Sequence, residues 1–221
     1  MAEEKIRVLI VEDHPIYRMG LKELINAQKD MAVCGEAEDV KEARRSIREV
    51  PPDMIILDLA LKNSSGVDLI KELADGNRKI PVLVLSMHDE SVHAQRCIAA
   101  GARGYIMKQE ASVSVVNVIR HIVSGNCYVS ERIMTQLLNR MCGQNEPIAK
   151  SPIDSLTDRE LEIFQLIGRG HSPSKIALQL HLSVKTVGAH KERIKEKLSI
   201  TDGGELVKFA ILWSESGSGI R

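Results

Sequence analysis

Short apolar runs alternate with amphipathic segments over the first half of the chain. The runs predict five β-strands: IRVLIV (6–11), MAVCGEA (31–37), MIILDL (54–59), PVLVLS (81–86) and GYIM (104–107). Between them, apolar positions recur at helical spacing, as in Ile16–Ala27 and Glu90–Ala100. Strands that alternate with helices form a parallel sheet covered on both faces. The predicted fold of this part is therefore α/β, a doubly wound parallel sheet of five strands.

The pattern becomes purely helical after about residue 124. Ser130–Met141 has helical periodicity, and the stretch after it, CGQNEPIAKSPID (142–154), is polar and contains proline. Four more helices are predicted: Asp158–Gly168, Ser174–Leu180, Val184–Leu198 and Gly203–Trp213. The short connection of three or four residues between the second and third of these is typical of a helix-turn-helix motif. The final SESGSGI is predicted to be a disordered tail.

These patterns divide the chain into an α/β domain (1–125), a linker helix with a linker (126–154) and a small all-α domain (155–221). A length of 221 residues suits two domains. The chain has 30 basic and 30 acidic residues, and a split after Asp154 leaves net charges of −2 and +2. So small a difference neither indicates nor excludes a nucleic-acid partner.

The cysteines and the hydropathy indicate the cellular compartment in which the protein is expected. The four cysteines contain no C-x-x-C pair, and no signal peptide precedes them. Reduced thiols and a cytoplasmic location are therefore expected, rather than disulfides or a zinc site. No apolar stretch approaches the ~18 residues that span a bilayer, so no membrane partner is expected.

Polar groups stand at the carboxyl ends of the predicted strands. In VLIVEDHP the first strand runs into Glu12 and Asp13, and the third strand ends at Asp58. Ligands of open parallel sheets bind at this edge, and three carboxylates there repel one another unless a hard cation such as Mg²⁺ lies among them. The fourth and fifth strands end at Ser86 and Lys108, which would complete an anion site. The set suits phosphoryl transfer onto a carboxylate.

Two other residues near these strands have simpler interpretations. His14 could be a metal ligand, but its place before Pro15 favours a role at the entry to a helix. Asp53 lies at the opposite end of its strand from Asp58, so a turn or cap role is expected for it.

The motifs VEDHP, IILDL, VLVLS and GARGYIMK, in this order and spacing, resemble those of response-regulator receiver domains over about the first half of the chain. The resemblance implies that Asp58 is the phospho-acceptor. The magnesium ligands that it implies are Glu12, Asp13, Asp58 and the backbone carbonyl of Ala60.

The same resemblance assigns roles on the other side of the acceptor. It implies that Lys108 and Ser86 contact the phosphoryl group, and that Tyr105 swings inward when Ser86 moves. The sequence departs from the family at Leu61 and Lys62, where methionine and proline are common. A flexible, charged loop is therefore expected beside the site.

The second domain, from LTDRE to IKEKL, resembles the LuxR-type helix-turn-helix of NarL/FixJ response regulators. Thr157 and Glu160 are predicted to form a capping box, and Ser183 to cap the helix after the turn. Helical spacing predicts the inward stripe of that helix to be Val184, Val187, Ile194 and Leu198. The opposite face would enter a major groove. The residues expected at DNA are Lys185, Thr186, Gly188, Ala189, Glu192, Arg193 and Lys195.

This outward face is less basic than the family pattern, which often has a basic residue where Gly188 or Glu192 stands. The phosphate contacts are expected from the four basic residues Lys185, Arg193, Lys195 and Lys197. Glu192 can accept a hydrogen bond from cytosine N4, so we hypothesise that it selects sequence. The alternative is that it pairs with Lys195, three residues further along the helix.

The apolar stripe of the last predicted helix consists of Leu206, Phe209, Ala210 and Trp213. Packing within the domain is the expected role, and in the family the corresponding helix also forms a dimer contact.

Together the two resemblances imply a two-component transcription regulator: a sensor histidine kinase phosphorylates Asp58, and homodimers engage paired half-sites in double-stranded DNA. There are two alternatives. A nucleotide-dependent enzyme is disfavoured because the turn EDHPIYRMG has no phosphate-binding glycines and there is no P-loop. A regulator that acts through protein contacts without phosphorylation is disfavoured by the intact acid cluster and Lys108.

Overall fold

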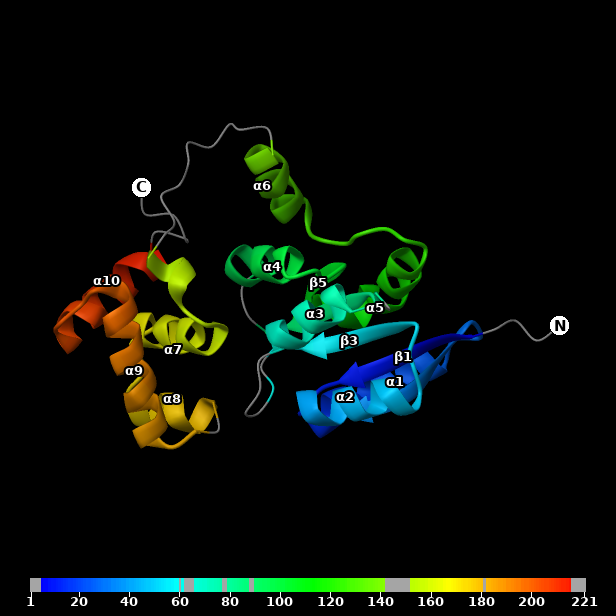
Figure 1. Cartoon of the computed structure of the whole chain (residues 1–221), viewed down its shortest axis with the longest axis horizontal. Coiled ribbons are helices and arrows are strands. Elements are labelled where there is room, and N and C mark those ends of the chain that lie inside the picture. The colour runs from blue at the N-terminus through cyan, green and yellow to red at the C-terminus, as the bar shows by residue number, and fades with distance from the viewer. Residues whose placement is uncertain are drawn as a thin grey trace. The chain divides into compact units, whose positions relative to one another are not determined.

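The computed structural model describes residues 5–59, 61, 66–76, 79–87, 90–141, 152–180 and 182–215 (Figure 1). Contacts divide the chain into two compact units, with the division between residues 141 and 142. None of the helices in the described ranges is long and apolar enough to cross a membrane.

The first unit contains a parallel sheet of five strands in the order β2-β1-β3-β4-β5. The strands are β1 (Ile6–Val11), β2 (Met31–Ala37), β3 (Met54–Asp58), β4 (Val82–Ser86) and β5 (Gly104–Met107). Every residue of β3 and β4 is buried, because helices cover both faces of the sheet. The predicted doubly wound α/β fold is confirmed.

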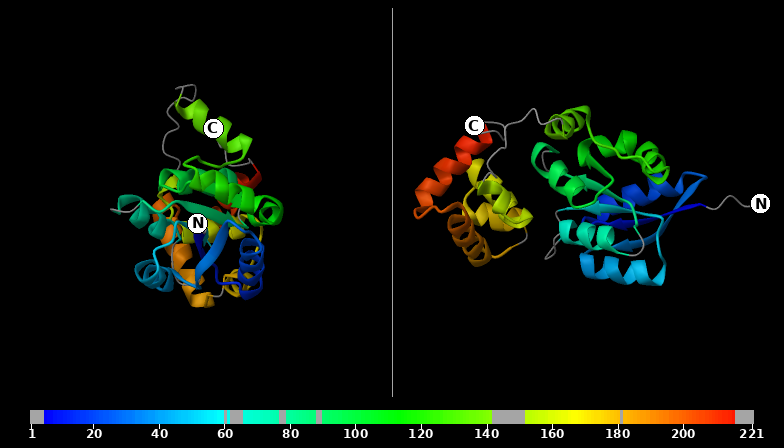
Figure 2. Two further views of the ribbon diagram at one scale, coloured as in Figure 1. Left: turned by 90° about the vertical axis from the view of Figure 1, so that its right-hand side faces the viewer. Right: turned by 45° about the horizontal axis from the view of Figure 1, so that its top comes forward.

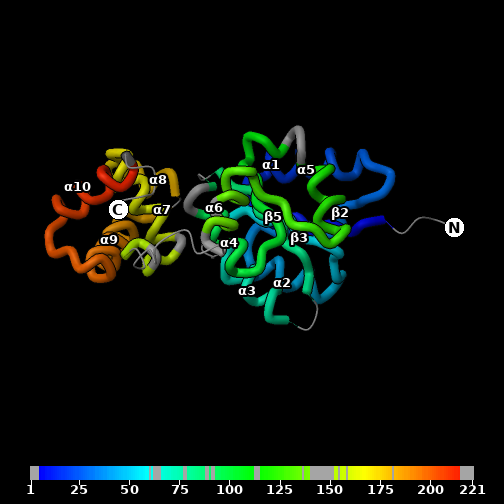
Figure 3. The backbone as a smooth tube through the Cα atoms, turned by 90° about the horizontal axis from the view of Figure 1, so that it is seen from above, coloured from blue at the N-terminus to red at the C-terminus, as the bar shows by residue number. Residues whose placement is uncertain are grey.

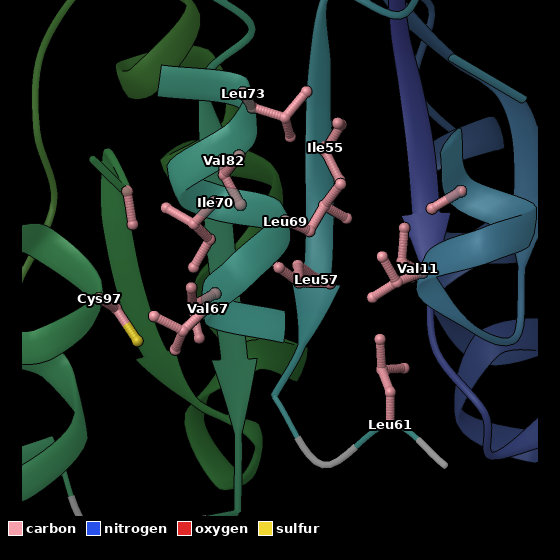
Figure 4. Close-up of a cluster of buried hydrophobic side chains, with 14 of the residues drawn as sticks. Val11, Ile55, Leu57, Leu61, Val67, Leu69, Ile70, Leu73, Val82 and Cys97 are labelled. Carbon is pink, nitrogen blue, oxygen red and sulfur yellow. The ribbon is translucent and has the colours of Figure 1, made fainter. Parts of the chain in front are cut away.

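Five helices connect and cover the strands: α1 (Pro15–Asn26), α2 (Val40–Glu49), α3 (Gly66–Asp75), α4 (Glu90–Ala99) and α5 (Lys108–Val123). Figure 3 shows α1 and α5 on one side of the sheet and α2 and α3 on the other. Leu9 and Val11 of β1 pack with α2 and α3, whereas Val8 and Ile10 pack with α1 and α5. This alternation follows from the two-residue repeat of a strand. Figure 4 shows the core under α3.

After α5 the chain returns beside the edge strand β5. Tyr128 forms a parallel bridge with Gly104, and the Tyr105 amide donates to the Tyr128 carbonyl at 2.9 Å. The next helix, α6 (Glu131–Met141), packs on α4, and its Ile133 is fully buried in the first unit's core. The first unit therefore extends to residue 141, beyond the expected end at 125. The region predicted as a linker continues through 142–151, outside the described residues.

The second unit consists of a short 3₁₀ helix, η1 (Pro152–Ser155), and the helices α7 (Asp158–Gly168), α8 (Pro173–Gln179), α9 (Val184–Leu198) and α10 (Gly203–Glu215) (Figure 2). The predicted all-α domain is confirmed, although η1 begins in the stretch predicted as linker, which ends at residue 154. The predicted tail lies outside the described residues from 216 onward.

Aromatic packing joins α7 to α10. The Phe164 ring centroid lies 5.8 Å from that of Phe209 and 5.6 Å from that of Trp213. Gly168 permits the close approach, because a Cβ there would lie 2.5 Å from the backbone oxygen of Ala210. The expected packing role of the α10 stripe is confirmed, since Leu206, Ala210 and Trp213 are buried.

Candidate functional site

Strand register brings the predicted acidic residues to one edge of the sheet. Val11 pairs with Leu57, so the next residues on the two strands, Glu12 and Asp58, stand side by side. Ser86 pairs with Met107, which places the following Lys108 at the same edge. Lys108 is the first residue of α5 rather than the last of the strand. Strand register thus places five residues from four segments of the chain at one edge: Glu12, Asp13, Asp58, Ser86 and Lys108.

Lys108 lies between two of the carboxylates. Its Nζ is 2.8 Å from Asp58 Oδ2 and 2.6 Å from Glu12 Oε2. All three side chains are nearly inaccessible, at 5% exposed for Lys108, 1% for Asp58 and 2% for Glu12. Buried charges at this distance interact more strongly than surface pairs because little water screens them.

The electrostatic potential at the cluster is negative. Burial raises the pKa of the Glu12 carboxyl above its ordinary value and the Asp58 charge adds to the effect, while Lys108 opposes both. Burial and the same two carboxylates raise the pKa of Tyr17 to about 12. One lysine therefore offsets only part of the charge of three carboxylates.

Residues that follow β1 also contact the cluster. The His14 amide donates to Glu12 Oε1 at 3.0 Å, and His14 Nδ1 lies 2.9 Å from that oxygen and 2.8 Å from Asp13 Oδ1. Arg18 donates to the Glu12 carbonyl at 2.6 Å. The ring of Tyr17 lies against Lys108, with Nζ 4.6 Å from its centroid.

Sequence reasoning missed Tyr17 and Arg18. The available signal was their place in the first turns of the helix after VEDHP, which directs them towards the carboxyl edge. His14 is the residue before α1, as expected for helix entry. Asp53 lies at the far end of β3, where it accepts from the Arg7 amide at 2.8 Å and pairs with its guanidinium at 2.9 Å.

The donor set suits a hard divalent cation. One ligand atom each from Glu12, Asp13, His14 and Asp58 can be chosen so that all lie within 4.8 Å of one another. Carboxylate oxygens suit Mg²⁺, which is typically held by one or two carboxylates together with waters and phosphate oxygens. The Ala60 carbonyl, predicted as a further ligand, lies outside the described residues.

The remaining predicted residues of this site are buried. Ser86 is 0% exposed at the end of β4, and Tyr105 is 1% exposed, so the Tyr105 ring already lies inside. The expectation of a flexible, charged loop after the acceptor stays a prediction, although its first described residue is buried. Leu61 is 3% exposed and packs in the core beside Val11 and Leu57 (Figure 4). Lys62 lies outside the described residues.

The second unit places α9 after a capped turn. The Ser183 side chain accepts from the Thr186 amide at 3.0 Å, and α8 ends four residues earlier at Gln179. Thr157 and Glu160 form the predicted capping box at the start of α7. Both capping predictions are confirmed.

One residue of the predicted inward stripe of α9 faces outward. Val187, Ile194 and Leu198 are buried, but Val184 is 51% exposed. At about 100° per residue Val184 lies roughly 60° from Val187, at the margin of the stripe, and the neighbouring helices leave it uncovered. The prediction for Val184 is therefore wrong.

The outward face of α9 has the predicted residues at different depths. Lys185, Ala189, Glu192 and Arg193 are exposed, and Thr186, Gly188 and Lys195 are half-buried. Glu192 Oε2 is 2.7 Å from Lys195 Nζ, so the structure contains the ion pair that was the alternative to a base contact. Lys197, expected at phosphates, instead reaches Glu160 at 2.6 Å.

The Lys197–Glu160 pair predicts a pH-dependent stability. Burial works to raise the pKa of the Glu160 carboxyl, but the bonds from Lys197 and Thr157 outweigh it and hold that pKa below its usual range. A lowered pKa stabilises the fold above the unfolded-state pKa, and this stabilisation is lost as the pH falls. We expect Glu160→Gln to lower the free energy of unfolding by about 1 kcal/mol at pH 7, and this difference to disappear as the pH falls through the lowered folded-state pKa of Glu160.

Urea unfolding followed by the fluorescence of Trp213, the single tryptophan, reports on the second unit in the intact chain. Thr157→Ala is the matched control, because it removes an uncharged cap bond and its effect of about 1 kcal/mol should persist at low pH. A Glu160→Gln difference of equal size at both pH values would show that the ion pair is not its cause.

Comparison with known proteins gives two family matches. The sequence model of the response regulator receiver domain matches residues 8–120, and that of bacterial regulatory proteins of the luxR family matches residues 154–210. The oxygen regulatory protein NreC of Staphylococcus epidermidis is 33% identical over 211 residues, covering 93% of this chain and 97% of that protein.

The solved structures that are similar to the chain include two response regulators. A LuxR-family two-component response regulator from Aurantimonas is 31% identical with a TM-score of 0.57, covering 63% of this chain and 99% of that one. RcsB from Salmonella enterica, solved bound to a promoter with the phosphomimetic BeF₃⁻, is 21% identical with a TM-score of 0.57. That match covers 94% of this chain and 98% of RcsB and supports the fold alone.

Proposed function

Because the chain belongs to the response regulators that join a receiver domain to a LuxR-type DNA-binding domain, we propose that phosphorylation of Asp58 controls its binding to DNA. The family consists of transcription regulators in two-component systems rather than enzymes. The observation that carries the assignment is the buried Asp58 carboxylate, which lies among Glu12 and Asp13 with Lys108 Nζ 2.8 Å from Asp58 and 2.6 Å from Glu12.

The proposed reaction transfers a phosphoryl group from a histidine of a sensor kinase. An Asp58 carboxylate oxygen attacks phosphorus and forms an O–P bond, while the donor's N–P bond breaks and its electron pair returns to the histidine ring. Lys108, which pairs with the carboxylate beforehand, then pairs with the phosphoryl oxygens. The Ser86 hydroxyl lies at the same edge and can donate to one of them.

Magnesium completes this proposal. The residues that would hold it are Glu12, Asp13 and Asp58, together with the backbone carbonyl of Ala60. When bound, the ion supplies positive charge that neutralises the phosphoryl oxygens. The protein's own contribution is to keep the carboxylates at one edge, through strand register and the bonds from His14 and Arg18 to Glu12.

The signal is proposed to pass to the second unit through the receiver surface. Movement of Ser86 towards the phosphoryl group would change the space available to Tyr105, which lies on the neighbouring strand. The partners are a sensor histidine kinase, double-stranded DNA and a second copy of the chain, so we place its action in the cytoplasm. RcsB has been solved as dimers bound to DNA.

The proposed function is tested by measuring dimer formation and DNA binding with and without a phosphoryl mimic. One small DNA-binding domain makes few contacts, so paired half-sites and a dimer raise the affinity. We expect a phosphoryl mimic with Mg²⁺ to shift sedimentation towards dimers and to tighten binding to a selected duplex. Asp58→Asn is the control that should not respond. Equal monomer fractions at all concentrations, with and without the mimic, would instead favour a regulator that works without phosphate.

The Glu192 hypothesis gives a second test on α9. Glu192 is 67% exposed, so its carboxylate can leave Lys195 for cytosine N4 in a groove. If it does, Glu192→Ala should tighten binding to random DNA and relax discrimination at one base pair, by about 1–3 kcal/mol. Lys185→Ala is the contrasting variant, expected to weaken binding to all sequences and to reduce the salt slope by roughly one unit.

Titrations against a series of base-substituted duplexes decide between the two readings of Glu192. The observed pair with Lys195 is the whole role if Glu192→Ala leaves both the preference profile and the random-DNA affinity unchanged.

A further inference from the structure

Val184 is an exposed aliphatic side chain at the start of the proposed recognition helix. The residue is 51% exposed, although sequence periodicity assigns it to the buried stripe. Among the described residues of α9 no other large aliphatic side chain is exposed to this degree. A β-branched residue is also a poor helix former, so helix propensity does not account for valine at this position.

The next turn of α9 leaves Val184 open. Side chains on a helix lean towards its N-terminus, so a side chain at position 188 would lean over Val184. That position is Gly188, and a Cβ built there would have no atom within 4 Å. The adjacent Ala189 is exposed and carries only a methyl group. Val184, Gly188 and Ala189 therefore form a surface of small, uncharged residues beside Lys185.

Such a surface is complementary to one chemical group in the major groove. The N-terminal residues of a recognition helix meet base edges, and low side chains allow the helix to approach them closely. The base edges there carry hydrogen-bonding groups, except for the C5-methyl group of thymine, which is the apolar feature of the groove. We propose that Val184 packs on a thymine methyl group and so selects a T·A pair in each half-site, an inference that rests on DNA binding by α9.

This selection is separate from that of Glu192. A carboxylate accepts a hydrogen bond from cytosine, whereas Val184 offers only van der Waals contact and excludes water. The two residues lie on different arcs of the helix, about 80° apart at 100° per residue, so they would read different base pairs.

The test replaces thymine by deoxyuridine, which removes the methyl group and leaves base pairing intact. A duplex is first selected from a random pool by the full-length chain with the phosphoryl mimic and Mg²⁺. Each thymine is then replaced in turn and the affinity is measured. One position per half-site should lose about fourfold in affinity, the factor that corresponds to one buried methyl group.

Val184→Ala should lose most of the preference for thymine over uracil at that position, and Val184→Ile should keep it. Leu178→Ala is the matched control, since Leu178 is 79% exposed on α8 and should leave the whole profile unchanged. Trp213 fluorescence checks that each variant is folded.

The outcomes separate this inference from the function on which it rests. If no duplex is enriched in any state, DNA binding itself is wrong and the inference falls with it. If a duplex is enriched but Val184→Ala has the same uracil profile as the unchanged chain, the role of Val184 alone is overturned.

Discussion

Asp58→Asn should take up no phosphoryl group from a small acyl-phosphate donor in Mg²⁺, whereas the unchanged chain should gain one. The asparagine amide has no anionic oxygen to attack phosphorus. Among the described carboxylates only Glu12 also pairs with Lys108, and Glu12 follows β1, whereas Asp58 is the last residue of β3. Intact-mass measurement gives the number of phosphoryl groups directly. A chelator should abolish labelling of the unchanged chain.

Asp53→Asn is the matched control, because Asp53 belongs to the same strand region but lies at its other end, paired with Arg7. It should label like the unchanged chain. Undiminished labelling of Asp58→Asn would show that the acceptor is another residue, and the mass of a proteolytic fragment would locate it.

Lys108→Met should lower the free energy of unfolding of the first unit by about 3 kcal/mol when divalent cations are removed. The reason is that Asp58 and Glu12, 1% and 2% exposed, would lose the ammonium group that lies 2.8 and 2.6 Å from them. Breaking a buried pair leaves an uncompensated charge, which costs more than the pair itself contributes.

The double variant Asp58→Asn, Lys108→Met should recover much of this loss, because it removes one of the stranded charges. Mg²⁺ should likewise restore stability to the single variant by supplying charge among the carboxylates. Urea unfolding followed by far-ultraviolet circular dichroism measures the loss, and Trp213 fluorescence should show the second unit unchanged. A Lys108→Met chain as stable as the original without Mg²⁺ would mean that Lys108 does not hold the cluster together.

The candidate site was predictable from sequence because its parts follow a local rule. Buried parallel strands read as continuous apolar runs, and their carboxyl ends share one edge. Glu12, Asp13 and Asp58 could therefore be grouped without coordinates. The rule says nothing of how the next turn folds back, so the contacts from Tyr17 and Arg18 were missed.

Local sequence patterns suffice to predict the α/β first half, the all-α second half, the helix caps and the residues at the strand ends, because each depends on neighbours a few positions apart. Packing between distant segments decided that α6 belongs with the first unit, that Leu61 is buried and that Lys197 binds Glu160. It also decided that Val184 is exposed. Periodicity fixes which side chains share a face of a helix or strand, whereas burial depends on elements from elsewhere in the chain that do or do not cover that face.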